Sequence, residues 1–285
     1  MPTHTTTLHP TPHALLRHAG AYLMGDPVAN GLLLGILHGI GGGEYVRPPL
    51  LAAVEDGDGA VDMVAVRTPP WQIVLSRGSD ASVAALVERL IEEKVETPGV
   101  HGPEETAGPF ATLWAERHGM IATVRQNLRL YTLDTLRPPD DVPGAMRPAA
   151  VDDGDLYLEW IDRFSDDAGV AAPAETRHER AMIMLRDGRI VLWTVDDQPV
   201  SMAGWIATPP NGARVGYVYT PPERRRNGYA SAVTAALSAQ LRRRGIDPCM
   251  LFTDLANPTS NDIYQRIGYR AVGDVVEYAF GESDS

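Results

Sequence analysis

The sequence predicts an α/β protein with a mixed central sheet flanked by helices, built as two similar halves. Short runs of β-branched and aromatic residues alternate with longer segments in which apolar residues recur every three or four positions. A stretch rich in proline and aspartate, 137–144, divides the chain near its middle. The order of helices and strands before this stretch is similar to the order after it. A chain of 285 residues suffices for two domains of ordinary size.

We therefore divide the chain into four parts. They are a flexible N-terminus at 1–12, a first domain at 13–136, a linker at 137–144 and a second domain at 145–285. The N-terminal part is rich in threonine and proline, which is typical of a frayed end. It holds His4 and His9, and His13 follows; with no carboxylate or cysteine beside them, these histidines predict no metal site.

The first domain is expected to contain helices, a hairpin and further strands and helices. Apolar spacing at 13–38 predicts one or two helices, and Asp56-Gly57-Asp58-Gly59 between two apolar runs predicts a hairpin turn. Gly41-Gly42-Gly43 precedes no Lys-Ser or Lys-Thr pair, so it predicts a turn and not a phosphate cradle. The remaining elements are expected to be a strand at 71–76, a helix at 80–94, a loop at 97–109, a helix at 110–118 and a strand at 120–136.

The second domain has a series of its own. We expect a strand at 145–150, helices at 152–167 and 174–186, strands at 190–195, 200–207 and 214–219, a helix ending at Arg244, a strand at 250–255 and a short helix after it.

The stretch around which the second domain is organised is 215–230, which predicts a strand, a turn and the start of a helix. At the first turn of a helix several backbone N–H groups lack partners and the macrodipole is positive, so this end attracts an anion. Gly228 and Ala230 leave room for a phosphate, and the arginines at 224–226 add positive charge. A pyrophosphate suits these donors. The alternative is a surface turn with three solvated arginines.

This loop resembles a motif of the GNAT superfamily, the acyl-CoA-dependent N-acyltransferases. Arg225-x-x-Gly228-x-Ala230 is similar to the family's Arg/Gln-x-x-Gly-x-Gly/Ala signature. A second motif follows at the spacing that the family has.

In that second motif Asn257 opens a short helix, Tyr264 lies within it, and Gly268-Tyr269 closes it. Asparagine is a good N-cap and glycine suits the position after a helix end, so both ends of the helix are specified. The resemblance covers about 145–280.

The resemblance implies the GNAT fold for the second domain, in the order β-α-α-β-β-β-α-β-α-β. The first domain has a similar order but carries Arg77-Gly78-Ser79-Asp80 at the matching turn, so we interpret it as a degenerate copy of the same fold. The chain is then a pseudo-tandem of two GNAT-like domains with one competent site. The alternative is an unrelated α/β domain before the linker.

The resemblance also implies roles for single residues. Residues expected to hold the pyrophosphate of coenzyme A through backbone N–H groups and charge are Arg225, Arg226, Asn227, Gly228, Tyr229 and Ala230. Residues expected to meet the pantetheine arm are Asn257 and, through their backbone, Val218, Tyr219 and Thr220, with an oxyanion donor near Val218. Tyr264 is expected to be the general acid for the leaving thiolate, since a phenol with a pKa of about 10 suits that task. The alternative is a core tyrosine on an amphipathic helix.

The general base stays open. Many relatives carry a Glu or Asp on the strand before the pyrophosphate loop, whereas 214–219 contains no carboxylate. Asp254 after the following strand is one candidate. A water relay or an amine that is already deprotonated is another, and Glu223 is expected to be solvated.

Composition limits the partners. A net charge of −12 disfavours a sequence-independent grip on nucleic acid or an anionic membrane, and it favours the approach of a cationic amine. The single cysteine, Cys249, excludes an intrachain disulfide and a cysteine-based zinc site, and we expect it to be a small buried side chain. No segment is long and apolar enough to span a bilayer and no secretory signal is recognisable, so a cytoplasmic location is expected.

We therefore expect a cytoplasmic N-acetyltransferase that transfers the acetyl group of acetyl-CoA to a primary amine, by direct attack in a ternary complex and without a metal. The acceptor is a small-molecule or peptide amine of open identity, and the oligomeric state stays open, with a homodimer as one alternative. The alternative is a CoA-binding regulatory or interaction module with little or no turnover.

Overall fold

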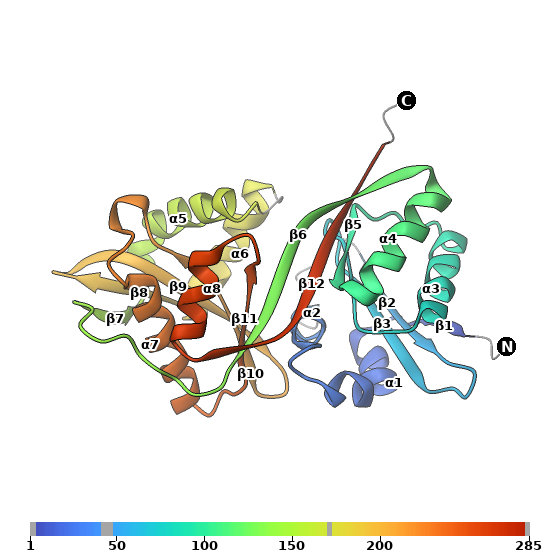
Figure 1. The fold of residues 1–285 in the computed structure, drawn as a ribbon, viewed down its shortest axis with the longest axis horizontal. Coiled ribbons are helices and arrows are strands. Elements are labelled where there is room, and N and C mark those ends of the chain that lie inside the picture. The colour runs from blue at the N-terminus through green and yellow to red at the C-terminus, as the bar shows by residue number, and fades with distance from the viewer. Residues whose placement is uncertain (1–3, 41–47, 170–172, 283–285) are drawn as a thin grey trace. The chain divides into compact units, whose positions relative to one another are not determined.

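The structure is a computed structural model and describes residues 4–40, 48–169 and 173–282. The turn predicted at Gly41-Gly42-Gly43 lies outside these residues. The chain forms two compact units (Figure 1). Unit 1 comprises Met1–Leu130, Thr253–Asn257 and Ala271–Ser285, and unit 2 comprises Tyr131–Phe252 and Pro258–Arg270. The units therefore do not part at a single linker, because the chain passes from one to the other more than once.

Unit 1 holds the first series of elements. They are β1 (Thr5–Leu8), α1 (Pro12–Gly25), α2 (Gly31–Ile40), β2 (Leu50–Glu55), β3 (Val61–Arg67), β4 (Ile73–Leu75), α3 (Asp80–Glu92), β5 (Gly99–Pro103), α4 (Glu104–His118) and β6 (Met120–Leu133), whose residues 131–133 belong to unit 2.

The sheet of unit 1 has the strand order β1-β2-β3-β4-β5-β12-β6. β4 and β5 are parallel, whereas β5 pairs antiparallel with β12, the last strand of the chain. Helices α1 and α2 bury Leu15 and Leu37 on one face. Helices α3 and α4 bury Leu86 and Trp114 on the other. Both faces are covered, as expected of a sheet with parallel strands.

The N-terminus differs from the prediction. Residues 5–8, expected to belong to a flexible end, form β1, which pairs antiparallel with β2. Three of the four residues of β1 are threonines, whose branched side chains favour an extended backbone. Nε2 of His9 lies 3.0 Å from Nδ1 of His18, and Nε2 of His18 lies 2.8 Å from a carboxylate oxygen of Glu55.

Strand β5 was also absent from the prediction, which placed a loop at 97–109. A Cβ at Gly99 would collide with the backbone carbonyl of Tyr278 on β12. The glycine is thus required by the close approach of a neighbouring strand and not by a turn. Because β5 contains glycine and proline, its composition is typical of a loop although it is a central strand.

Unit 2 holds the second series. Its elements are β7 (Ala145–Pro148), η1 (Val151–Asp153), α5 (Gly154–Asp167), α6 (Ala174–Arg186), β8 (Ile190–Val195), β9 (Gln198–Thr208), β10 (Gly212–Tyr219), η2 (Pro222–Arg224), α7 (Tyr229–Arg243), β11 (Cys249–Asp254), α8 (Pro258–Arg266) and β12 (Tyr269–Glu282), whose residues 271–282 belong to unit 1.

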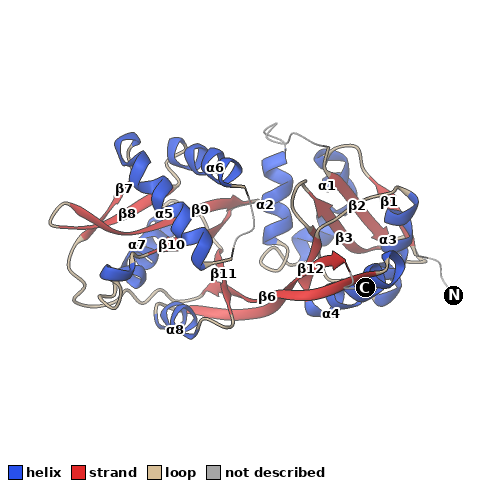
Figure 2. Cartoon of the chain, turned by 90° about the horizontal axis from the view of Figure 1, so that it is seen from above, coloured by secondary structure: helices blue, strands red, loops and turns tan. Residues whose placement is uncertain are grey.

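The sheet of unit 2 has the order β7-β8-β9-β10-β11-β6-β12. Val233 of α7 and Tyr264 of α8 pack on one face. Tyr157 of α5 and Met184 of α6 pack on the other. Figure 2 shows α6 and α8 on opposite sides of β9 and β10. Both units have the order β-α-α-β-β-β-α-β-α-β, so the predicted pseudo-tandem of one fold is confirmed.

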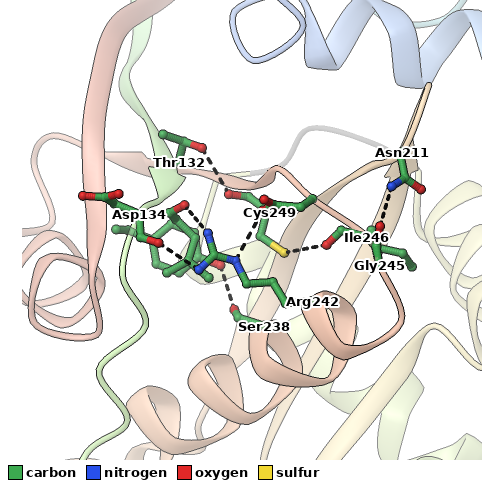
Figure 3. A network of polar contacts seen from close by, with 11 residues as sticks. Thr132, Asp134, Asn211, Ser238, Arg242, Gly245, Ile246 and Cys249 are labelled. Atoms are coloured by element: carbon green, nitrogen blue, oxygen red, sulfur yellow. Dashed lines mark hydrogen bonds and ion pairs between the residues drawn. The ribbon is translucent and has the colours of Figure 1, made fainter.

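Polar contacts fix the end of β6 inside unit 2 (Figure 3). Arg242 of α7 donates to the carbonyl oxygens of Leu133 and Asp134 at 2.7 and 2.8 Å. The hydroxyl of Thr132 donates to the carbonyl oxygen of Cys249 at 3.5 Å. Cys249 is fully buried, as expected, and burial raises the pKa of its thiol to about 11. The thiol is therefore protonated at neutral pH.

Candidate functional site

The parallel strands β10 and β11 of unit 2 separate soon after they begin. Among the described residues their pairing is confined to Ala213 with Cys249 and Arg214 with Met250. Beyond these pairs the facing strand edges offer backbone groups with which an extended ligand can pair. The opening lies beside the residues predicted to meet a pantetheine arm.

A bulge interrupts β10 at those residues. Its register with β9 runs to Gly216, skips Tyr217 and Val218, and resumes at Tyr219. Tyr217 has a φ of 53°, which is uncommon for a residue other than glycine. Bulges of this kind redirect backbone groups and are frequent next to active sites. The backbone of Val218 is thereby taken out of the ladder with β9, which is the condition for its N–H to serve a ligand.

The loop after β10 presents consecutive backbone N–H groups at the start of α7. Outside the regular helix and strand ladders, no hydrogen bond among the described residues has the N–H of any residue in 226–230 as its donor. Arg226 and Gly228 have φ values of 67° and 79°. Such alternating turns gather successive N–H groups into a concave site for anions. Because Tyr229 is only 9% exposed, its buried side chain anchors this end of the helix.

Two of the predicted loop side chains brace the loop. Nε of Arg225 donates to the carbonyl oxygen of Thr220 at 3.0 Å, and its Nη2 pairs with Asp167 at 2.7 Å. Nδ2 of Asn227 donates to two loop carbonyl oxygens at 3.0 and 3.1 Å. Arg226 is exposed and has no ion pair within the described part of the chain. The side chains of Arg225 and Asn227 thus tie the loop to itself and to α5, while the backbone N–H groups at 226–230 and the side chain of Arg226 take no part in these contacts.

Gly228 is required at this turn for two reasons. Its φ of 79° lies in the left-handed region, where a side chain is strained. A Cβ would also lie 2.9 Å from Cγ2 of Val142, a residue of the stretch predicted as a linker. The stretch 137–144 therefore packs on the loop of unit 2.

Tyr264 is a buried residue of α8. It is 8% exposed, and its ring meets that of Tyr269 edge to face, with 6.2 Å between the centroids. Burial raises the pKa of Tyr264 to about 12. The phenol is therefore protonated at neutral pH, the state that a general acid needs. Its ring also belongs to the core with Val233 and Leu251, so both predicted roles are compatible with the structure.

Asn257 and Asp254 belong to the segment 253–257, which clusters with unit 1. Oδ1 of Asp254 accepts the N–H of Ala256 at 2.8 Å, and its carbonyl oxygen accepts the N–H of Asn257 at 3.0 Å. These contacts make Asp254 a turn residue between β11 and α8. Both residues cluster with unit 1 and not with the loop of unit 2. The role of Asp254 as a general base and that of Asn257 in binding the pantetheine arm stay predictions.

A group of side chains on the opposite face of β10 was not predicted from the sequence. They are Tyr157 on α5, Arg180 on α6, and Arg214 and Tyr217 on β10; the last two were noted only for lacking a carboxylate. The helical spacing of Tyr157 predicts a core residue, and the side chain is indeed completely buried, so nothing in the sequence marks it as functional. Helical and strand periodicity cannot reveal that two helices bring it towards a strand arginine.

The start of α3 in unit 1, which corresponds to the start of α7 in unit 2, has different surroundings. There the carboxylate of Asp62 accepts hydrogen bonds from the N–H of Ser79 at 2.9 Å, from the hydroxyl of Ser79 at 2.7 Å and from that of Ser82 at 2.6 Å. Burial alone would raise the pKa of Asp62, but the hydrogen bonds from Ser82 and Ser79 outweigh it and hold the pKa below its ordinary value. The side chain of Arg77 pairs with Glu105. The start of α3 is thus already occupied by an anion of the same chain, the carboxylate of Asp62.

Two further features concern ligands and membranes. In the described ranges no group of three or more His, Cys, Asp and Glu side chains is arranged to hold a metal ion. None of the helices in those ranges combines the length and the apolar character needed to cross a bilayer.

Comparison with known proteins agrees with this geometry. A family model described as FR47-like protein matches residues 192–278, which include the loop and α8. A GNAT-family acetyltransferase from Colwellia psychrerythraea is similar over 97% of this chain and 100% of its own, with 10% identity and a TM-score of 0.57. A GCN5-related N-acetyltransferase from Sphaerobacter thermophilus is similar over 96% of this chain and 94% of its own, with 15% identity and a TM-score of 0.62.

A structural-genomics protein from Drosophila is similar over 98% of this chain and 99% of its own, with 14% identity and a TM-score of 0.69. No curated protein matches the chain in sequence. At these identities the likeness establishes the fold: the chain has the fold of GCN5-related N-acetyltransferases, and that prediction is confirmed. The matches span nearly the whole of each chain, so the presence of two units is shared with them.

Proposed function

We propose that this chain, whose fold is that of the GCN5-related N-acetyltransferases, transfers the acetyl group of acetyl-CoA to a primary amine at a site in unit 2. The observation that carries the proposal is the row of backbone N–H groups at 226–230 that have no partner in the described part of the chain, beside strands that separate. A diphosphate satisfies such a row at a helix start. The FR47-like match over the same residues supports the proposal.

In this proposal the chain holds and polarises the thioester, which supplies the activated acetyl group. Val218 donates its N–H to the carbonyl oxygen, which gains negative charge as the amine nitrogen attacks the carbonyl carbon. The C–N bond forms, the C–S bond breaks, and Tyr264 gives its proton to the departing sulfur. The amine loses its proton to water, since no described residue on β10 after Arg214 is a carboxylate.

A CoA-binding module with little turnover is the second candidate. The observation that favours it is the half-buried Arg214 on the strand where a general base is expected. An arginine cannot take a proton from an ammonium group at neutral pH. The net charge of −12 disfavours nucleic acid as a partner of either candidate. We also propose a cytoplasmic location and an amine acceptor.

Thiol release distinguishes the candidates. The purified full chain is incubated with acetyl-CoA and a panel of amines, and free CoA thiol is measured, while calorimetry measures CoA binding. Turnover with at least one amine supports the enzyme. Binding of CoA without turnover supports the module, and the absence of both refutes the proposal.

A matched pair of charge reversals tests the loop. Arg226→Glu changes an exposed residue of the loop, and Arg243→Glu changes an exposed residue at the other end of α7. Losing a charge-assisted contact to a phosphate is expected to weaken CoA binding on the order of 10- to 100-fold for Arg226→Glu. Arg243→Glu has the same effect on net charge and is expected to alter the dissociation constant less than about twofold. Equal effects of the two variants would contradict a diphosphate site in the loop.

A further inference from the structure

The hydroxyl of Tyr157 is a polar group without a partner in the core of unit 2. The side chain is completely buried, and the hydroxyl has no hydrogen-bond partner in the described part of the chain. A buried hydroxyl left unpaired costs free energy, so native structures rarely keep one without a reason. Burial raises the pKa of this phenol far above its ordinary value, so the hydroxyl is a hydrogen-bond donor at neutral pH.

Arg214 lies on the same face of the sheet as Tyr157. Directly opposite residues of an antiparallel pair share a face, and Arg214 lies opposite Ile206. Ile206 packs against the core cluster that contains Tyr157. The other face of the sheet holds Ala213 and Val215, which pack with α7. The guanidinium is therefore directed to the side of α5 and α6, away from the helix that carries the loop.

Two residues further along β10 there is open space on this face. Gly216 lies opposite Gly204. A Cβ at Gly204 would meet Ile190 and Met184, whereas a Cβ at Gly216 would meet no atom within 4 Å. The space over Gly204 is thus filled by Ile190 of β8 and Met184 of α6, whereas the space over Gly216 is open.

The charges around this open space are unbalanced. Arg214 is half-buried, which lowers its pKa, and Arg180 adds a second positive charge that lowers it further. Tyr217 and Arg180 act on Tyr157 as well, so Tyr157 and Arg214 share these two neighbours. Neither arginine has an ion pair with a carboxylate of the described residues. An anion placed here would relieve the repulsion between them and accept the phenol's hydrogen bond.

We infer that this face of β10 recognises an anionic group of the acceptor, so that the preferred substrate is an amine that also carries a carboxylate. Arg214 binds the carboxylate with its guanidinium fork, and Tyr157 donates its hydroxyl to one of the carboxylate oxygens. Arg180 at the rim adds attraction. The open space over Gly216 leaves room for the atoms that join the carboxylate to the amine.

This inference rests on the proposed acetyl transfer, because it names the acceptor class of the same site. It also accounts for the arginine at a strand position where a general base is expected. The residue there has a binding task, and the amine is selected by the carboxylate next to it.

The test compares matched acceptors on the full chain. Amino acids and short peptides are assayed beside the amide or decarboxylated amine of each, with acetyl-CoA and thiol detection. We expect the carboxylated member of each pair to have the higher kcat/KM. Arg214→Gln is expected to raise KM for the carboxylated member on the order of 10- to 100-fold and to leave the amide unaffected. Arg186→Gln, an exposed arginine at the end of α6, serves as the control and is expected to change neither.

Tyr157→Phe separates recognition from folding. If the hydroxyl does not bind the acceptor, Tyr157→Phe removes an unpaired group, so the melting temperature stays the same or rises and KM does not change. If it binds the acceptor, the melting temperature behaves in the same way, but KM for the carboxylated acceptor rises about 2- to 10-fold.

The outcomes of the two proposals are distinguishable. Equal activity on both members of every pair, with CoA bound normally, overturns the carboxylate inference and leaves acetyl transfer standing. If no acceptor turns over, binding of N-acetylated amino acids and their amides to the CoA-loaded chain is measured by calorimetry. No preference for the carboxylated ligand, or a preference that survives Arg214→Gln, also overturns the inference.

Discussion

Replacing Asp62 by asparagine tests whether unit 1 fills its own anion site. The carboxylate of Asp62 accepts three hydrogen bonds at the start of α3, two from Ser79 and one from Ser82. In the Asp62→Asn variant the side chain keeps an acceptor oxygen and a similar shape but loses the negative charge. The variant therefore removes charge assistance without opening a cavity.

The expected loss of stability follows from these contacts. A hydrogen bond to a charged group contributes about 1 kcal/mol more than a neutral one, and a charge at a helix start contributes about 0.3–1 kcal/mol. Since the three bonds share one oxygen and are not additive, we expect the free energy of unfolding to fall by about 2 kcal/mol. Asp80→Asn, in the first turn of the same helix, loses only the helix contribution and serves as the control.

The pH dependence gives the sign of the effect. The folded-state pKa of Asp62 is depressed, because its hydrogen bonds outweigh the effect of burial. Its contribution is therefore present above the unfolded pKa of about 3.9 and lost as the pH falls through the folded value. Urea unfolding of wild type and Asp62→Asn should differ most near pH 7 and converge below about pH 4. A difference that is absent at pH 7, or equal to that of Asp80→Asn, would refute the argument.

Three further predictions concern unit 2. Arg242→Ala should lower the free energy of unfolding by about 2–4 kcal/mol in urea titrations, because two carbonyl oxygens at the end of β6 lose a charged donor; no change would mean that these contacts are solvent-replaceable. Gly228→Ala should lower the free energy of unfolding by about 2–3 kcal/mol, because the new side chain is strained at a positive φ and collides with Val142. Adding Val142→Ala to this variant should recover only the part due to the collision. Full recovery of the stability would contradict backbone strain at this position. Tyr264→Phe should lower kcat on the order of 100-fold or more with the CoA dissociation constant unchanged, and since the pKa is raised to about 12, the wild-type rate should show no loss of this acid up to about pH 10; an unchanged kcat would refute the assigned acid.

The repeated order of elements could be predicted because each helix and hairpin carries a local pattern. Exposed and buried positions alternate at helical spacing in α3, and Asp56-Gly57 forces a turn between β2 and β3. β5 could not be predicted, because Gly99 is dictated by the carbonyl of Tyr278, which is remote in sequence. The passage of β12 into unit 1 is likewise a tertiary property that no local pattern contains.

The candidate site divides in the same way. The anion-binding loop could be predicted, since its glycine, its arginines and the helix after it are contiguous in the chain. The carboxylate of Asp62 at the start of α3 could not be predicted, and neither could the placement of Tyr157 and Arg214 on one face of the sheet, because each depends on residues brought together from separate elements. The bracing role of Arg225 was missed for the same reason: its partner Asp167 lies on α5.

The central claim is that backbone amides at the start of α7, and not those at the start of α3, bind the diphosphate of coenzyme A. Titration of CoA into labelled protein, followed by amide NMR, tests it directly. We expect large shifts for the N–H groups of 226–230 and none for those of 79–82. Unmoved resonances at 226–230, or shifts at the start of α3 instead, would contradict it.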